Sequence, residues 1–413
     1  MIINPPIVTH SAGNLELRAH IAFQDTVSEC FYGVPEKYAS FVDTSSANCF
    51  LVGLLYPAMR YGEDIHVEGK VSARLLYNLN QYVIHMLSSC DARLHPIHIT
   101  AKTTDDRGYP DAKAVTTGFS GGIDSFHAIY GHYEVPTPDG FRLTHLLSFN
   151  VGAHGIPKTS EEQVTIEQKF HARYKRLASF PKEIGLDFIP VNSNIHCFHP
   201  WGHLEVCTLA NLSAVLFLQR GIKRYYLASS GHPFSAIWHY LGDNRRPDDI
   251  ALLNTYLLPW MSTESCDFLE DGSFYDRSQK TAQIADYPPV AKYLNVCCNY
   301  DTLDTNCSIC NKCCRTLLTL ELLGKLEAFS NVFDLNKYHN KARRLYIART
   351  IVTEKTELFS KHLMDLAREK GINLRAEVNC LDIFRAKMMD GRLHNFIRNN
   401  RVLKKIAKMF FKE

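Results

Sequence analysis

Six of the chain's 13 cysteines fall within residues 297–314, a density typical of a metal site. Two successive C-x2-C steps bring thiolates together from a tight turn, and one preceding cysteine completes the tetrahedron that structural zinc prefers. Adjacent strand residues point to opposite faces, so only one of Cys297 and Cys298 can readily join them. Choosing Cys298 gives C-x8-C-x2-C-x2-C, so the predicted zinc ligands are Cys298, Cys307, Cys310 and Cys313. An iron–sulfur cluster and buried cysteines without metal are the alternatives.

A glycine loop follows a predicted strand and precedes a predicted helix, and it reads Ser120-Gly121-Gly122-Ile123-Asp124-Ser125. Backbone N–H groups at such a helix start suit a polyphosphate, glycines let it approach closely, and serine hydroxyls add donors. Asp124 would repel bare phosphate, so we expect it to help hold Mg²⁺. The loop lacks the ending of a Walker motif and the spacing of a dinucleotide fingerprint. The alternative is a tight turn with a capping serine.

Three histidines, His196, His199 and His203, form H-x2-H-x3-H after the third predicted strand of the central region. The pattern contains no carboxylate, and Pro200 and Gly202 break any helix there. We therefore predict no catalytic metal at this position, and contact with a substrate stays open.

The elements that must position these residues belong to an ordinary globular protein. Hydrophobic residues make up 46% and charged residues 22% of the chain, which excludes disordered and fibrous classes. The net charge of +3 gives no chain-wide field for nucleic acid or membrane. We expect a cytoplasmic protein, because no apolar run is long enough to cross a bilayer, the first residues lack a signal-peptide pattern, and the clustered cysteines suit a reducing compartment.

Three regions are predicted. Residues 1–112 form an N-terminal α+β domain with helices near 43–62 and 71–87 and strands near 64–67 and 96–101; the first helix is capped by Asp43, Thr44 or Ser45. Residues 113–330 alternate strands (114–119, 143–151, 187–192, 224–229) with helices (161–177, 203–219). That alternation predicts an α/β domain with a parallel sheet and helices on both faces. Residues 331–413 are helical and basic.

The last segment, 392–413, carries seven basic residues and one acid interleaved with apolar residues. Such a helix can pack on its own domain, bind phosphate backbones or lie on an anionic membrane. We expect it to provide a surface for a protein or nucleic-acid partner.

The glycine loop resembles the pyrophosphatase loop of the N-type ATP pyrophosphatases, the PP-loop superfamily. These enzymes attack the α-phosphate of ATP, adenylate a substrate and release pyrophosphate. The resemblance implies a five-stranded parallel sheet, ATP and Mg²⁺ as cofactors, and Asp124 as a catalytic residue. It also implies that adenine lies near the end of the second strand and that a further nucleotide loop follows the fourth; the residues concerned are Phe149, Asn150 and Val151, and Ser230, Gly231 and His232.

Together with the cysteines, this loop makes residues 113–320 similar to the zinc-containing 7-cyano-7-deazaguanine synthase family, which converts a carboxylate to an amide and then a nitrile. Residues 277–281 resemble that family's lysine segment, which implies that Lys280, with Arg277 beside it, reaches ATP phosphate. Longer relatives of this family include proteins of bacterial antiphage defence systems.

The resemblance implies an ATP-dependent carbon–nitrogen ligase. Its substrate would be 7-carboxy-7-deazaguanine or a related acid, which is adenylated and passed to ammonia or an amine with release of AMP and pyrophosphate. A nucleic-acid-modifying adenylase or thiolase is an alternative, for which Cys207 or Cys314 would have to be reactive. A non-catalytic nucleotide-binding subunit of a larger complex is another. The acceptor, the nitrogen donor and the oligomeric state are left open.

Overall fold

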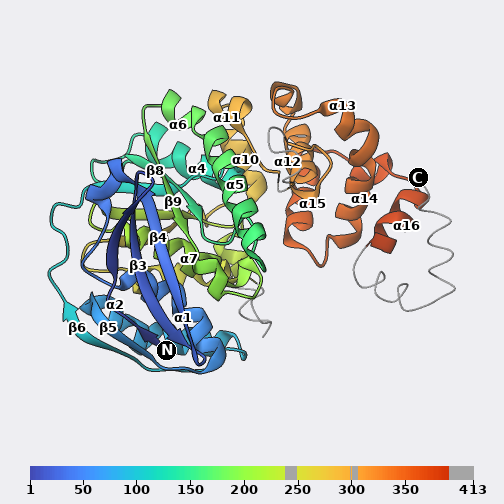
Figure 1. Ribbon diagram of the computed structural model, residues 1–413. Helices are drawn as coiled ribbons and strands as arrows, with labels where there is room; N and C mark the ends of the chain where they lie inside the picture. The colour runs from blue at the N-terminus through green and yellow to red at the C-terminus, as the bar shows by residue number, and fades with distance from the viewer. Residues whose placement is uncertain (238–248, 298, 300–305, 390–413) are drawn as a thin grey trace. The chain divides into compact units, whose positions relative to one another are not determined.

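The computed structural model describes residues 1–237, 249–297, 299 and 306–389 (Figure 1). The chain forms two compact units, Met1–Phe274 and Tyr275–Glu413. The limits predicted at residues 112 and 330 do not coincide with this division. The predicted basic tail, 392–413, lies outside the described residues.

The described part of the first unit is α/β, with one mixed sheet of 11 strands in the order β11-β10-β7-β8-β9-β4-β3-β1-β5-β6 and with β2 paired to β3. The strands are β1 Ile2–Ile3, β2 Ile7–Ser11, β3 Asn14–Phe23, β4 Thr26–Pro35, β5 Ile65–Ser72, β6 Ile99–Asp105, β7 Ala114–Gly118, β8 His145–Asn150, β9 Asp187–Ser193, β10 Ile222–Ala228 and β11 Asp267–Asp271.

The sheet corrects the prediction of a separate five-stranded sheet. The pairs among β7 to β11 are all parallel, but β9 also pairs antiparallel with β4. The N-terminal strands therefore continue the same sheet instead of forming their own domain. A free β9 edge would expose unpaired backbone groups, and pairing with β4 satisfies them. The hairpin strands β2 to β4 and the last strand, β11, were not predicted.

Helices connect the parallel strands in the predicted alternation. The connecting helices are α4 Ile123–Ile129, α5 Ser160–Leu177, α6 Ser179–Glu183, α7 His203–Phe217 and α9 Asn254–Met261. Right-handed crossovers place those that lead from β7 to β9 on one face and those that lead to β10 and β11 on the other. The helix α1 Asn48–Tyr61 packs on α7. At Gly53 of α1 a Cβ would lie 2.6 Å from the Tyr32 hydroxyl, so this close approach requires glycine.

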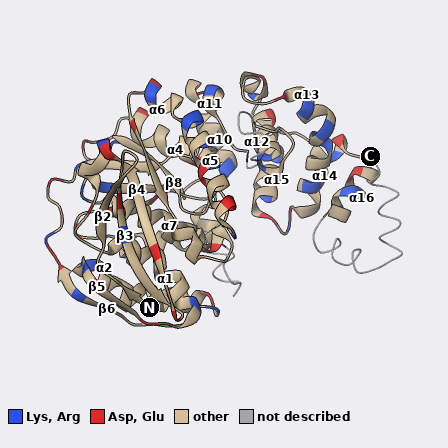
Figure 2. Cartoon of the chain, viewed as in Figure 1, with Lys and Arg blue, Asp and Glu red and all other residues tan. Residues whose placement is uncertain are grey.

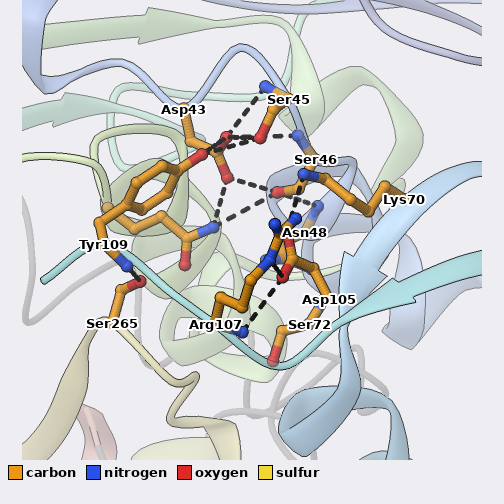
Figure 3. A network of polar contacts seen from close by, with 11 residues as sticks. Asp43, Ser45, Ser46, Asn48, Lys70, Ser72, Asp105, Arg107, Tyr109 and Ser265 are labelled. Carbon is orange, nitrogen blue, oxygen red and sulfur yellow. Dashed lines mark hydrogen bonds and ion pairs between the residues drawn. The ribbon is translucent and has the colours of Figure 1, made fainter.

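The start of α1 differs from the prediction. Its N-cap is Ala47, without a side-chain hydrogen bond, and Asp43 is instead buried in the polar network of Figure 3. The Asp43 carboxylate accepts hydrogen bonds from Ser46, Tyr109 and Gln219. Burial raises its pKa, but these hydrogen bonds outweigh burial and hold the pKa below its usual value. One carboxylate thus ties the segment before α1 to the loop before β7 and to the end of α7.

The second unit is helical over its described residues. It contains α10 Arg277–Ile284, α11 Pro288–Tyr293, α12 Asn311–Leu322, α13 Leu335–Lys337, α14 Arg343–Thr353, α15 Leu358–Glu369 and α16 Cys380–Met389. The helices predicted after residue 330 are present, and basic residues lie along α14 (Figure 2). Among all described helices, none has the length and apolar character needed to cross a membrane.

The network in Figure 3 predicts a stability effect. The substitution Asp43→Asn should lower the free energy of unfolding at pH 7 by about 1–3 kcal/mol, because it leaves buried donors badly matched. Below about pH 4 the difference from wild type should narrow, since the depressed pKa of Asp43 gives stability that is lost as the carboxylate protonates. Urea unfolding of both proteins at several pH values measures the difference in unfolding free energy at pH 7 and its decrease at low pH. The exposed Asp111→Asn is the control, and equal stability of wild type and Asp43→Asn at pH 7 would contradict the role.

Candidate active site

The order of the parallel strands creates a switch point beside β7. The chain runs from β7 to β8 and β9 on one side, and then returns to place β10 on the other side of β7. At such a point the loops after two neighbouring strands turn in opposite directions and leave a crevice at the carboxyl ends. The loops concerned are residues 119–122, after β7, and 229–232, after β10. The two loops predicted to bind nucleotide therefore follow the two neighbouring strands at this switch point.

The loop after β7 has the backbone that a phosphate cradle needs. Gly121 has φ +76°, which disfavours any other residue, and Gly122 is the N-cap of α4 without a side-chain cap. The helix continues as the π-helical turn η3 Tyr130–Glu134. Within the loop, the Ser125 hydroxyl donates to the Gly122 carbonyl at 3.0 Å and lies 3.3 Å from the Ser120 hydroxyl. The predicted loop residues are thus together, with Ile123 buried and Asp124 half-buried in the first turn of α4.

The ends of β8 and β9 form the neighbouring part of this edge. Asn150 ends β8 between Phe149 and Val151, is fully buried, and donates from Nδ2 to Oδ1 of Asn192 on β9 at 2.7 Å. No described residue pairs with Asn150 Oδ1. After β10, the predicted loop Ser230-Gly231-His232 turns at Gly231, whose φ is +85°.

Histidines gather next to the ends of β8 and β9. A Cβ on Gly152, which follows β8, would lie 3.2 Å from His196 Cβ and 3.3 Å from His203 Nδ1. Burial, followed by neighbouring cationic groups, lowers the pKa of His154 and of His196 to about 4 each. Burial likewise lowers the pKa of His199 to about 3. These imidazoles are neutral at pH 7 and can donate and accept hydrogen bonds.

Besides His154, the sequence analysis missed three further residues near this edge. Arg173 of α5 donates from Nη2 to the Ser120 carbonyl at 2.9 Å, and it also lowers the pKa of His154, so it links the glycine loop to the histidines. His132 of η3 lies 2.8 Å from Asp271, at the end of β11. Burial raises the pKa of Asp271, but hydrogen bonds to His127 and His132 keep it low. Recognising β11 as a strand would have indicated Asp271.

The predicted phosphate ligands Arg277 and Lys280 lie one turn apart on α10, which starts with a capping box of Asp276 and Gln279. Lys280 is fully buried, and the Arg277 guanidinium lies over the Phe359 ring at 4.9 Å. Both residues belong to the second unit, so their approach to a phosphate on the glycine loop stays a prediction.

Four cysteines of the second unit form a group able to hold a metal: Cys297, Cys307, Cys310 and Cys313, whose sulfurs all lie within 4.8 Å of one another. Two sulfur pairs, Cys297–Cys310 and Cys307–Cys313, are 3.9 Å apart. Tetrahedral zinc with bonds of about 2.3 Å requires sulfur separations of about 3.8 Å, so the donor set fits. Among the described residues this is the one such group.

The fourth sulfur of this group is that of Cys297, where the spacing led us to choose Cys298; Cys298 lies outside the described residues. Cys297 lies in this group because of Asn306. The Asn306 Oδ1 accepts hydrogen bonds from the N–H groups of Val296 and Cys297, at 2.9 and 3.1 Å, and so holds this backbone beside the turn that carries Cys307 and Cys310. Hydrogen bonding, chiefly with Cys313, lowers the pKa of Cys310 to about 4. A thiolate is therefore stabilised at the N-cap of α12.

Comparison with known proteins adds no relative: no family model, curated protein or solved structure matches the chain.

The cysteine group predicts about one zinc per chain by elemental analysis. Substitutions Cys297→Ser and Cys313→Ser should each abolish it and destabilise the protein by about 3 kcal/mol or more, because metal-binding free energy is folding free energy in such sites. Cys298→Ser and the exposed Cys380→Ser should keep both the metal and the stability. Full zinc in Cys297→Ser, or its loss in Cys298→Ser, would show that Cys298 is the ligand.

Proposed function

We propose that this protein is an ATP-dependent ligase that adenylates a carboxylate and passes it to ammonia or an amine, releasing AMP and pyrophosphate. The observation that carries the proposal is the glycine turn before α4 at the switch point of the parallel strands, with a second glycine turn after the adjacent strand β10. Switch points of this kind favour ligand binding, which supports a nucleotide site here, and the resemblance to the N-type ATP pyrophosphatases supplies the reaction.

The chemistry assigned to each residue follows from charge. Backbone N–H groups of residues 121–123 would bind phosphate oxygens at the positive end of α4. Asp124 would hold Mg²⁺, which neutralises phosphate charge when bound. Arg277 and Lys280 are proposed to stabilise the departing pyrophosphate. Adenylation gives the carboxylate the leaving group that it lacks.

The acceptor is proposed to bind toward the ends of β8 and β9. Buried neutral histidines and the open Oδ1 of Asn150 suit a polar molecule, and Arg173 beside them suits an acid. A carboxylate acceptor would then lie between these residues and the glycine loop. The resemblance suggests 7-carboxy-7-deazaguanine or a related acid, in an antiphage defence setting.

The thiolase alternative is disfavoured by the two cysteines that it requires. Burial raises the pKa of Cys207 to about 12, and burial together with Cys310 raises the pKa of Cys314 to about 12. Neither thiol is ionised near neutral pH, and thiolates are the nucleophiles in such chemistry. Release of pyrophosphate distinguishes the two remaining hypotheses, because a ligase releases it from ATP and a non-catalytic nucleotide-binding subunit does not.

For the loop, the decisive substitution is Asp124→Ala. It should reduce pyrophosphate release from ATP, assayed with a panel of carboxylic acids, by about 100-fold or more, because it removes the proposed Mg²⁺ contact. Thermal unfolding should be little changed. The exposed Asp139→Ala is the matched control. Wild-type turnover in Asp124→Ala would refute the assignment, and ATP binding without any pyrophosphate release by the wild type would favour the non-catalytic subunit.

A further inference from the structure

Arg315 of α12 is a largely buried guanidinium that the proposed chemistry does not use. Its side chain is 13% exposed. Its Cζ lies 3.7 Å from the centroid of the Phe359 ring on α15, and Arg277 of α10 lies over the same ring at 4.9 Å. Contacts join these three helices within the second unit. Two guanidinium groups from different helices therefore meet at one aromatic ring.

The charge of Arg315 is only partly balanced. Among the described residues, its ion pair is with Glu357, at 3.4 Å from Nη2 to Oε1, and Arg349 shares that carboxylate at 3.8 Å. Glu357 also accepts a hydrogen bond from Ser360 at 2.7 Å. The buried Nε of Arg315 has no hydrogen-bond partner among the described residues. One carboxylate thus serves two guanidinium groups, with Arg277 adding positive charge beside them.

Without a bound anion, this arrangement of Arg315 lowers the stability of the folded protein. A buried charge that lacks a full partner destabilises the fold, and packing on Phe359 alone would be served equally well by an apolar side chain. By contrast, the guanidinium of Arg343 on the neighbouring helix α14 has two carboxylate partners, Glu321 and Glu377. The same unit therefore supplies carboxylates where arginine has a purely structural role.

We propose that Arg315, together with Arg277, forms an anion-binding site that takes the pyrophosphate group. The planar fork of arginine donates two parallel hydrogen bonds to phosphate oxygens, and two such groups suit a multiply charged anion. The side chains are recessed among helices, which favours a compact anion over a polymer backbone. This inference rests on the proposed function for the origin of the pyrophosphate, but its binding is measurable without turnover.

The cysteine group gives the site its position. Cys310 is the N-cap of α12 and Cys313 lies in its first turn, two residues before Arg315. A metal held by Cys310 and Cys313 would fix the start of this helix and hence the position from which the Arg315 side chain extends. The four cysteines would then also help to position Arg315 for anion binding.

The test is calorimetric titration of the full-length, zinc-loaded protein with inorganic pyrophosphate, without ATP or acceptor. Arg315→Gln should weaken binding at least tenfold, and Arg315→Lys should also weaken it, because lysine keeps the charge but loses the fork. Arg344→Gln is the matched control: Arg344 is 55% exposed and pairs with Asp382, so binding should be unchanged. Zinc content and thermal unfolding are checked for each variant.

The inference is overturned if the wild type does not bind pyrophosphate, or if a folded Arg315→Gln protein binds it as the wild type does. If Arg315→Gln does not fold, Arg315→Lys is used instead: weaker pyrophosphate binding supports the inference, and binding equal to that of the wild type overturns it. Salt-dependent binding of single-stranded DNA or RNA that depends on Arg315, with weak pyrophosphate binding, would also overturn it in favour of a polymer site. If pyrophosphate binding depends on Arg315 but the protein does not turn over ATP, the anion site is supported and the proposed ligase function is contradicted.

Discussion

The antiparallel pairing of β4 with β9 is the constraint on which the first unit depends. Its register joins Tyr32 to Ser193 and Gly33 to Asn192, and it fuses the N-terminal strands with the parallel strands into one sheet. The buried Tyr32 hydroxyl then donates to Ser213 of α7 at 2.8 Å, beneath the glycine of α1. Without this pairing, β9 would be an edge strand.

The same pairing reaches the candidate site. Asn194, directly after β9, accepts the Phe31 N–H at 2.9 Å and donates to the Glu29 carbonyl at 2.8 Å. The segment that carries His196 and His199 is therefore anchored by β4 at its start. The N-terminal strands have a role in the site although they carry none of its chemistry, because they determine where the histidines lie relative to Asn150 and Arg173.

In the second unit, the cysteine group and the proposed anion site share one helix, α12. The thiolates stabilise the start of α12, and the guanidinium of Arg315 lies one residue beyond Cys314 in that helix. Burial raises the pKa of Cys314, the residue between Cys313 and Arg315, by more than the positive charge of Arg349 on α14 lowers it.

The sequence alone determined the local features. Period and spacing indicated β7, β8, β9 and β10, the glycine loop between β7 and α4, and the cysteine knuckle, because each depends on residues close together in the chain. Only the tertiary structure decided which edges pair, that β4 continues the sheet, and that Arg173 meets Ser120 while Arg315 meets Phe359. It also placed Cys297 beside the other cysteines, where its backbone N–H donates to Asn306 Oδ1, a contact that spacing does not reveal. Long-range pairing and side-chain burial depend on the whole packed chain, so no local pattern encodes them.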